Sequence, residues 1–166
     1  MNNKIITKNN YAFIDGNNLY LGIKEQGWRL DYRKFRIFLK DKFNVDKAFL
    51  FIGYVPGNEK MYANFQKFGY ICIFKPTLEI KDSKIKKIKG NVDAELVLHS
   101  MIEYDNYDKA VLVTSDGDFY CLVEYLVSKN KFLKLLVPSK KYSSLFRKFS
   151  RYIDNLSLYR SKIEFK

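Results

Sequence analysis

The chain has 166 residues, of which 47% are hydrophobic and 17% aromatic. It is therefore long enough and apolar enough to fold around one core, which excludes a largely disordered protein. It also carries 30 Lys and Arg against 18 Asp and Glu, a formal net charge of +12. A folded domain this basic is expected to bind polyanions, with nucleic acid as the first partner class and an anionic membrane surface as the second.

The few histidines and cysteines exclude several kinds of site. His99 is the single histidine, so a catalytic or zinc site built on several histidines is excluded. Cys72 and Cys121 each lie in an apolar run and are expected to be small core residues, not a metal pair or a disulfide framework. The N-terminus does not resemble a signal peptide, and no apolar run approaches the roughly 18 residues of a membrane helix. We therefore expect a cytoplasmic protein without a membrane partner.

Short apolar runs alternate with segments of helical spacing along the chain. Strands are expected at residues 11–14, 47–55, 70–74, 109–114 and 132–137. Helices are expected at residues 19–25, 30–39, 59–68, 91–104 and 119–127, and again after residue 138. This alternation predicts a three-layer α/β/α sandwich with a mostly parallel central sheet of about five strands.

The boundaries of the domain follow from composition. Residues 1–10 form a polar leader, residues 11–155 the domain, and residues 156–166 a basic tail. The segment 76–90 is rich in lysine with isoleucines spaced between, which favours a hairpin or a mobile flap.

Acidic residues follow two of the predicted strands. Asp15 ends the first strand, while Asp116 and Asp118 follow the fourth with one glycine between them. In a doubly wound sheet these two strands flank the point where strand order reverses, and ligands bind at that edge. Asp93 opens the helix that leads into the fourth strand. We therefore expect four carboxylates to converge on one edge of the sheet.

Such a cluster suits Mg²⁺ or Mn²⁺, which prefer oxygen ligands. One or two ions there would lower the pKa of a bound water and stabilise a leaving oxygen, as phosphodiester hydrolysis requires. Asn18 would orient the attacking water or a carboxylate, and Ser115 would contact a phosphate oxygen. Each acid also has a structural interpretation, because Asp15 lies in a turn, Asp118 suits a helix N-cap and Asp93 suits a first helical turn. The two roles can coexist.

Three segments resemble the signature segments of NYN domains, which belong to the PIN-like nuclease superfamily. They are Phe13-Ile-Asp-Gly-Asn-Asn-Leu19, Lys89-Gly-Asn-Val-Asp-Ala-Glu95 and Val113-Thr-Ser-Asp-Gly-Asp-Phe119, in the order of the family. The resemblance implies a PIN-like fold and metal-dependent RNA cleavage. It also implies the site residues, which are Asp15, Asn18, Asp93, Asp116 and Asp118.

Two basic segments, 75–90 and 138–151, are candidates for holding a polynucleotide backbone against the acidic edge. The basic residues expected to contact it are Lys86, Lys87, Lys89, Lys140, Lys141 and Arg147. Four aromatic residues are interleaved with the basic residues of this region, namely Tyr142, Phe146, Phe149 and Tyr152. Those that are exposed would stack on single-stranded bases. The favoured alternative for Phe146 and Phe149 is that they are core residues of a last helix.

The first hypothesis is therefore a metal-dependent endoribonuclease acting on single-stranded or structured RNA. A non-catalytic RNA-binding module of the same fold and a DNA-directed nuclease are the alternatives, and a homodimer remains open.

Overall fold

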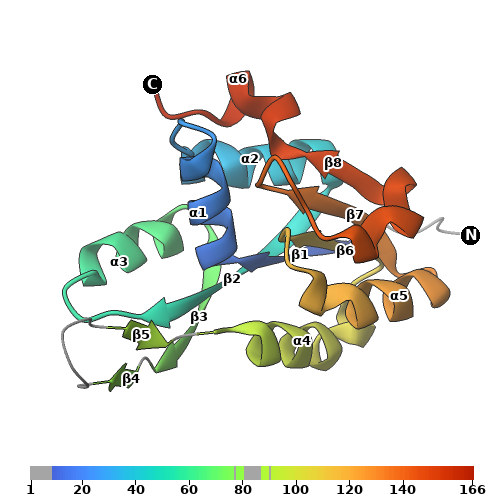
Figure 1. Cartoon of the computed structure of the whole chain (residues 1–166), viewed down its shortest axis with the longest axis horizontal. Helices are drawn as coiled ribbons and strands as arrows, with labels where there is room; N and C mark the ends of the chain where they lie inside the picture. The colour runs from blue at the N-terminus through green and yellow to red at the C-terminus, as the bar shows by residue number, and fades with distance from the viewer. Residues whose placement is uncertain (1–8, 77, 81–86, 90) are drawn as a thin grey trace, which may run out of the picture.

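The computed structural model describes residues 9–76, 78–80, 87–89 and 91–166, and for residues 78–80 and 87–89 it describes the backbone alone. Six parallel strands form the central sheet in the order β3-β2-β1-β6-β7-β8 (Figure 1). Their bounds are β1 Asn10–Asp15, β2 Val45–Tyr54, β3 Tyr70–Pro76, β6 Ala110–Val113, β7 Phe132–Val137 and β8 Ile153–Asn155. The predicted α/β architecture with a mostly parallel sheet is confirmed.

Helices cover both faces of the sheet. Their bounds are α1 Gly16–Glu25, α2 Tyr32–Phe43, α3 Glu59–Lys67, α4 Asp93–Ile102, α5 Tyr120–Ser128 and α6 Arg160–Ile163. Short 3-10 helices are η1 Tyr104–Asn106, η2 Gly117–Phe119, η3 Ser144–Tyr152 and η4 Leu156–Tyr159. Helices α1 and α2 lie on one side of the sheet, and α4 and α5 lie on the other (Figure 1). None of the helices in the described part of the chain is long and apolar enough to cross a membrane.

Alternation along the strands divides the core into two clusters, one on each face of the sheet. In β1, Ala12 and Ile14 pack with α1, α2 and α3, whereas Tyr11 and Phe13 pack with α4 and α5. Successive strand side chains point to opposite faces, so a strand buried on both sides reads as continuously apolar. Every residue of β1 and β6 is buried, and these two strands form the centre of the molecule.

The chain reverses its direction of winding beside β1. The connections after β1 lead outward to β2 and β3, and β6, β7 and β8 then extend the sheet on the other side. Strands β1 and β6 pair in parallel with Ile14 beside Val113. The residues that follow these two strands therefore meet at one edge, as expected for the first and fourth predicted strands.

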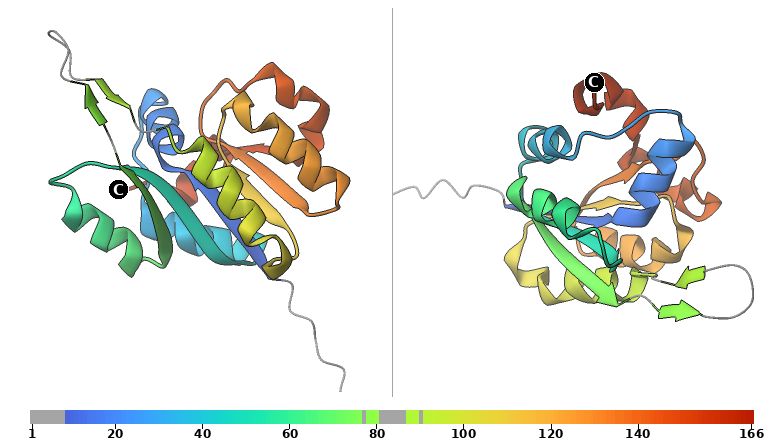
Figure 2. Two further views of the ribbon diagram at one scale, coloured as in Figure 1. Left: turned by 90° about the horizontal axis from the view of Figure 1, so that it is seen from below. Right: turned by 90° about the vertical axis from the view of Figure 1, so that its left-hand side faces the viewer.

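The basic segment after β3 contains an antiparallel pair of short strands, β4 (Leu78–Ile80) and β5 (Lys87–Lys89). The hairpin alternative is thus confirmed for the backbone of these residues. Figure 2 shows the pair projecting away from the body of the molecule.

The region after β7 differs from the prediction. Instead of one α-helix, Ser144–Tyr152 forms a 3-10 helix kinked at Phe149, and β8 adds a sixth strand to the five expected. Strand β8 has three residues and no apolar alternation, so periodicity could not reveal it. Its pairing with β7 is accompanied by an ion pair of 2.9 Å between Lys134 Nζ and Asp154 Oδ1.

Four side chains test the burial that was expected from the sequence. Phe146 and Phe149 are buried, which confirms the core interpretation for both. Cys121, expected in the core, is exposed, and Cys72 is half-buried. Helix α5 buries Leu122, Val123 and Leu126, so Cys121 lies on the opposite side of the helix despite its apolar neighbours.

The C-terminal residues pack against the helices on one face of the sheet. Leu156 and Ile163 are both fully buried in the cluster that contains Phe35 and Leu39 of α2. Leu30 forms an isolated bridge with Glu164. Residues 156–166, which the composition predicted to be a basic tail, thus contribute apolar side chains to the core.

Ile163→Ala is expected to lower the free energy of unfolding by about 2–5 kcal/mol, because it removes a fully buried side chain and leaves a cavity. Leu158→Ala is the matched control, since Leu158 is 71% exposed and should change stability by less than about 0.5 kcal/mol. Urea unfolding followed by circular dichroism measures both. Equal midpoints for the two variants would contradict the packing of α6.

Candidate functional site

Three carboxylates from two distant segments meet at the edge of the sheet. One oxygen each of Asp93, Asp116 and Asp118 lies within 4.8 Å of the others. Asp93 is the first residue of α4, and Asp116 and Asp118 flank Gly117 in the turn that follows β6. Asp118 is exposed while Asp93 and Asp116 are half-buried, so the cluster opens toward solvent.

The donor set fits a small divalent cation. Opposite ligands of a Mg²⁺ ion lie roughly 4.2 Å apart, since each Mg–O distance is about 2.1 Å. The three carboxylate oxygens lie within 4.8 Å of one another, a separation of the same order. All three donors are carboxylate oxygens, the ligand type that Mg²⁺ and Mn²⁺ prefer.

Asp15 lies behind this cluster at the end of β1 and is 6% exposed. Burial raises the pKa of its carboxyl from 3.8 to about 6. Hydrogen bonds from the Asn18 backbone amide and the Thr114 hydroxyl oppose the rise in pKa, and the charges of Asp93 and Asp116 add to it. The structure therefore brings Asp15 within electrostatic reach of the cluster, although Asp15 is not one of the three residues whose oxygens meet.

The acids also serve as helix caps. The Asp15 carboxylate accepts a hydrogen bond of 3.1 Å from the Asn18 amide and caps α1. Asp116, and not Asp118, caps η2, because its Oδ1 accepts from the Asp118 amide at 2.9 Å. A carboxylate has two oxygens, so a residue that caps with one keeps the other for a ligand.

Gly117 is required by a close approach between the acidic turn and a loop. A Cβ atom at this position would lie 2.2 Å from Ser143 Oγ and 2.7 Å from Ser143 Cβ. The Ser143 amide donates to the Ser115 carbonyl at 3.3 Å. The glycine between the two acids thus lets the 138–143 loop pack directly on the turn.

Asn18 and Ser115 join the elements that carry the acids. Asn18 Oδ1 accepts a hydrogen bond of 2.8 Å from the Ser115 amide, which links α1 to the turn after β6. Ser115 Oγ accepts a hydrogen bond of 3.2 Å from the Ser139 amide. These atoms therefore hold the edge together, and contacts of the two side chains with water or phosphate stay predictions.

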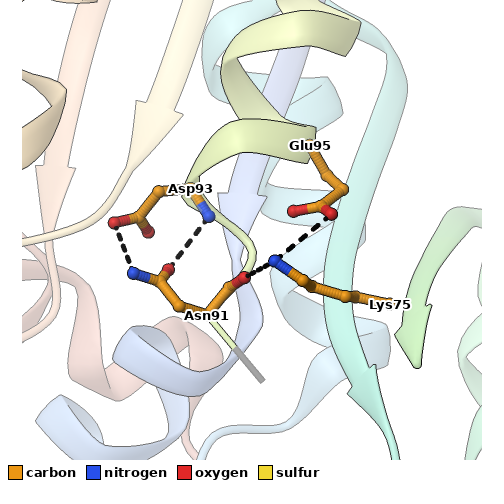
Figure 3. A network of polar contacts seen from close by, with 4 residues as sticks. All are labelled: Lys75, Asn91, Asp93 and Glu95. Atoms are coloured by element: carbon orange, nitrogen blue, oxygen red, sulfur yellow. Dashed lines mark hydrogen bonds and ion pairs between the residues drawn. The ribbon is translucent and has the colours of Figure 1, made fainter. Parts of the chain in front are cut away.

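A polar network missed by the sequence reasoning holds Asp93 in place (Figure 3). Asn91 Nδ2 donates to Asp93 Oδ2 at 2.9 Å, and the Asp93 amide donates back to Asn91 Oδ1 at 3.0 Å. Lys75 Nζ donates to the Asn91 carbonyl at 2.6 Å and pairs with Glu95 Oε1 at 3.4 Å. The only sign of this network in the sequence is that Lys75 directly follows the apolar residues of a predicted strand.

Some of the groups around Asp93 raise the pKa of its carboxyl and others lower it. Burial raises the pKa of Asp93, its hydrogen bond with Asn91 lowers it, and the charges of Asp116 and Asp118 raise it again. The ammonium group of Lys75 lowers it. Lys75 therefore offsets part of the repulsion that the clustered acids create.

The structure describes the side chains of only some of the predicted basic residues. Lys140 and Lys141 are exposed on the loop that packs against the acidic turn, and Arg147 is exposed in η3. Lys86 lies outside the described residues, as do the side chains of Lys87 and Lys89. The structure thus places the 138–143 loop, the first part of the second basic segment, against Ser115 of the acidic turn.

Comparison with known proteins agrees with this arrangement. The family model for the NYN domain matches residues 11–158. The chain is 27% identical over 160 residues to low amplitude and bright protein LabA from Synechococcus elongatus, covering 92% of this chain and 86% of LabA. A crystal structure of a Vibrio parahaemolyticus protein of unknown function superposes with a TM-score of 0.69 at 22% identity, covering 93% and 94% of the two chains, which supports the fold.

Asp15→Asn is expected to stabilise the metal-free protein at neutral pH. Because the pKa of Asp15 is raised to about 6 on folding, the stability associated with its protonated form is present below about pH 4 and is lost as the pH rises through about 6. The shift corresponds to about 3 kcal/mol. Urea unfolding in EDTA should therefore show the variant gaining up to about 3 kcal/mol over wild type between about pH 4 and about pH 7. A difference that stays constant across this range would contradict the burial of a charged Asp15.

Proposed function

Because the chain belongs to the NYN domain family, we propose that it is a metal-dependent endoribonuclease. The observation that carries the proposal is the meeting of Asp93, Asp116 and Asp118 at the carboxyl edge of a parallel sheet. Ligand sites of such sheets lie at this edge, beside the strands where the winding reverses. The proposed reaction is hydrolysis of phosphodiester bonds in RNA.

Asp93, Asp116 and Asp118 would hold the cation, which we propose to be Mg²⁺ or Mn²⁺. A bound divalent ion supplies charge stabilisation at the phosphate and a water of lowered pKa. The three carboxylates on their own would repel a phosphate, so the site depends on the ion to accept its substrate. Asn91 and Lys75 orient Asp93 for this role through the contacts described above.

Asp15 would act through its charge. Its oxygens accept hydrogen bonds from the Asn18 amide and the Thr114 hydroxyl, which fix the carboxyl behind the cluster. A cation bound nearby favours the ionised form of Asp15, and the ionised form in turn attracts the cation. Asp15 therefore strengthens ion binding even without direct contact.

The basic loop supports a nucleic-acid substrate. Lys140 and Lys141 are exposed on a loop bonded to Ser115, one residue before Asp116. Cationic side chains next to a carboxylate cluster can hold the flanking phosphates of a polynucleotide while the cluster takes the phosphate to be cleaved. The same surface suits a non-catalytic RNA-binding module or a DNA-directed nuclease, and the experiment below separates these.

The test is cleavage of a labelled single-stranded RNA by purified protein in Mn²⁺, in Mg²⁺ and in EDTA. Asp116→Asn should abolish cleavage in both metals and keep RNA binding, because it removes a ligand and leaves the basic loop intact. Asp105→Asn is the matched control, since Asp105 is exposed and outside the cluster, and it should cut like wild type. A single-stranded DNA of the same sequence tests the sugar preference.

Two results would overturn the nuclease. Cleavage that persists in EDTA or in Asp116→Asn would show that the carboxylate cluster is not responsible. Binding of RNA without cleavage in either metal would favour the non-catalytic module, and cleavage of DNA in place of RNA would favour the DNA-directed enzyme.

Asn91→Ala is expected to raise the Mn²⁺ concentration for half-maximal cleavage about 10- to 100-fold, which is typical when a group that orients a metal ligand is removed. Asn64→Ala is the control, because Asn64 is exposed in α3 on the opposite face of the sheet from α4. Saturating Mn²⁺ should restore most of the activity of Asn91→Ala. An unchanged Mn²⁺ dependence would show that the network in Figure 3 does not position Asp93 for the ion.

A further inference from the structure

A groove with apolar walls leads away from the carboxylate cluster along α4. Asp93 and Asp118 line it at one end. Its remaining lining residues are apolar and come from α4 and η2, namely Ala94, Val97, Leu98, Met101 and Phe119. Residues three and four apart lie on the same side of a helix, so the α4 side chains form a continuous wall that starts at Asp93.

This wall is uncovered in the described part of the chain. Leu98 is 59% exposed and Met101 is 37% exposed. A contiguous patch of exposed apolar side chains often marks a binding surface, whereas apolar residues that are exposed singly are common and need no such explanation. The exposed residues here adjoin two of the three proposed cation ligands.

The chemistry of the groove excludes a phosphate track. The protein carries a net charge of +12, yet no Lys or Arg occurs among the described residues that line the groove. Its ligand must therefore present an apolar face immediately beside a group that the cation holds. A nucleotide has this character, because its phosphate suits the cation and the face of its base is apolar.

A second copy of the chain fits the groove less well. A stable protein interface buries about 800 Å² on each partner and involves about 20–30 residues a side. The exposed apolar side chains of the groove belong to a single stretch of one helix. A flat base on Leu98 and Met101 needs no more than this, and methionine packs favourably against aromatic rings.

We propose that the groove binds the unstacked base of the nucleotide adjoining the phosphate held at the carboxylate cluster. The proposal rests on the proposed nuclease function and adds to it a base site formed by Leu98 and Met101. Apart from the two carboxylates at its end, the described residues that line the groove include no polar side chain to read a base edge, so the site takes any base. The faces of bases in a duplex are covered by their neighbours, so the site requires an unpaired nucleotide.

The experiment compares Leu98→Ser with wild type on two probes of equal length. The first is a labelled single-stranded RNA oligonucleotide, and the second is the same ribose–phosphate chain without bases. Binding is measured with Ca²⁺ in the otherwise wild-type chain, so that each pair of measurements differs only at residue 98. Leu158→Ser is the control, since Leu158 is exposed in η4 on the other side of the sheet.

Leu98→Ser is expected to weaken binding of the RNA about tenfold, in line with the loss of one base contact, and to leave binding of the abasic chain unchanged. Leu158→Ser should change neither. Equal losses on the two probes would overturn the base site, because the substitution would then act through the fold or the backbone. A change of oligomeric state in sedimentation of Leu98→Ser would also overturn it, since the surface would then be an interface between copies.

The base site and the nuclease fail in different ways. Base-dependent loss of binding in a protein that never cuts RNA would support the groove and remove the nuclease. Metal-dependent cleavage with no base-dependent effect of Leu98→Ser would keep the nuclease and remove the groove.

Discussion

Repulsion between carboxylates at one edge of the sheet is the constraint on which the rest of the structure depends. Asp93, Asp116 and Asp118 lie with oxygens within 4.8 Å, and Asp15 lies buried behind them with its pKa raised to about 6. Like charges at such separations oppose folding unless a positive group offsets them. Lys75 supplies part of that offset at Asp93, and a divalent cation would supply the remainder.

The fold is suited to holding this unfavourable arrangement. Two fully buried strands, β1 and β6, lead into Asp15 and into the turn with Asp116 and Asp118, while Asp93 opens α4. The core on both faces fixes the register between β1 and β6. Hydrogen bonds then lock the loops, since Asn18 holds Ser115 and Ser115 in turn holds the 138–143 loop. That loop carries Lys140 and Lys141, and both side chains are exposed.

Much of this could be predicted from the sequence because it follows from strand ends. Apolar runs that stop at Asp15 and before Asp116 place both acids at the carboxyl edge of a parallel sheet, and Asp93 opens the intervening helix. Features set by tertiary contacts could not be predicted. Strand β8 is defined by pairing with β7 and has no periodicity of its own, and Cys121 faces solvent because its apolar neighbours do the packing. The contact of Lys75 with Asn91 joins an edge strand to a helix start, a proximity that no spacing along the chain reveals.

The proposed metal-dependent phosphate site and the apolar groove therefore share one edge of the sheet, because Asp93 and Asp118 belong to both. The proposal that everything else rests on is that Asp93, Asp116 and Asp118 hold one divalent cation between them. The most direct measurement is anomalous diffraction from crystals of the protein grown with Mn²⁺. We expect a peak between these three carboxylates that disappears in Asp116→Asn crystals. Two results would contradict this cation site. One is well-ordered carboxylates with no peak between them. The other is a peak at a different cluster in crystals of a protein that still cleaves RNA.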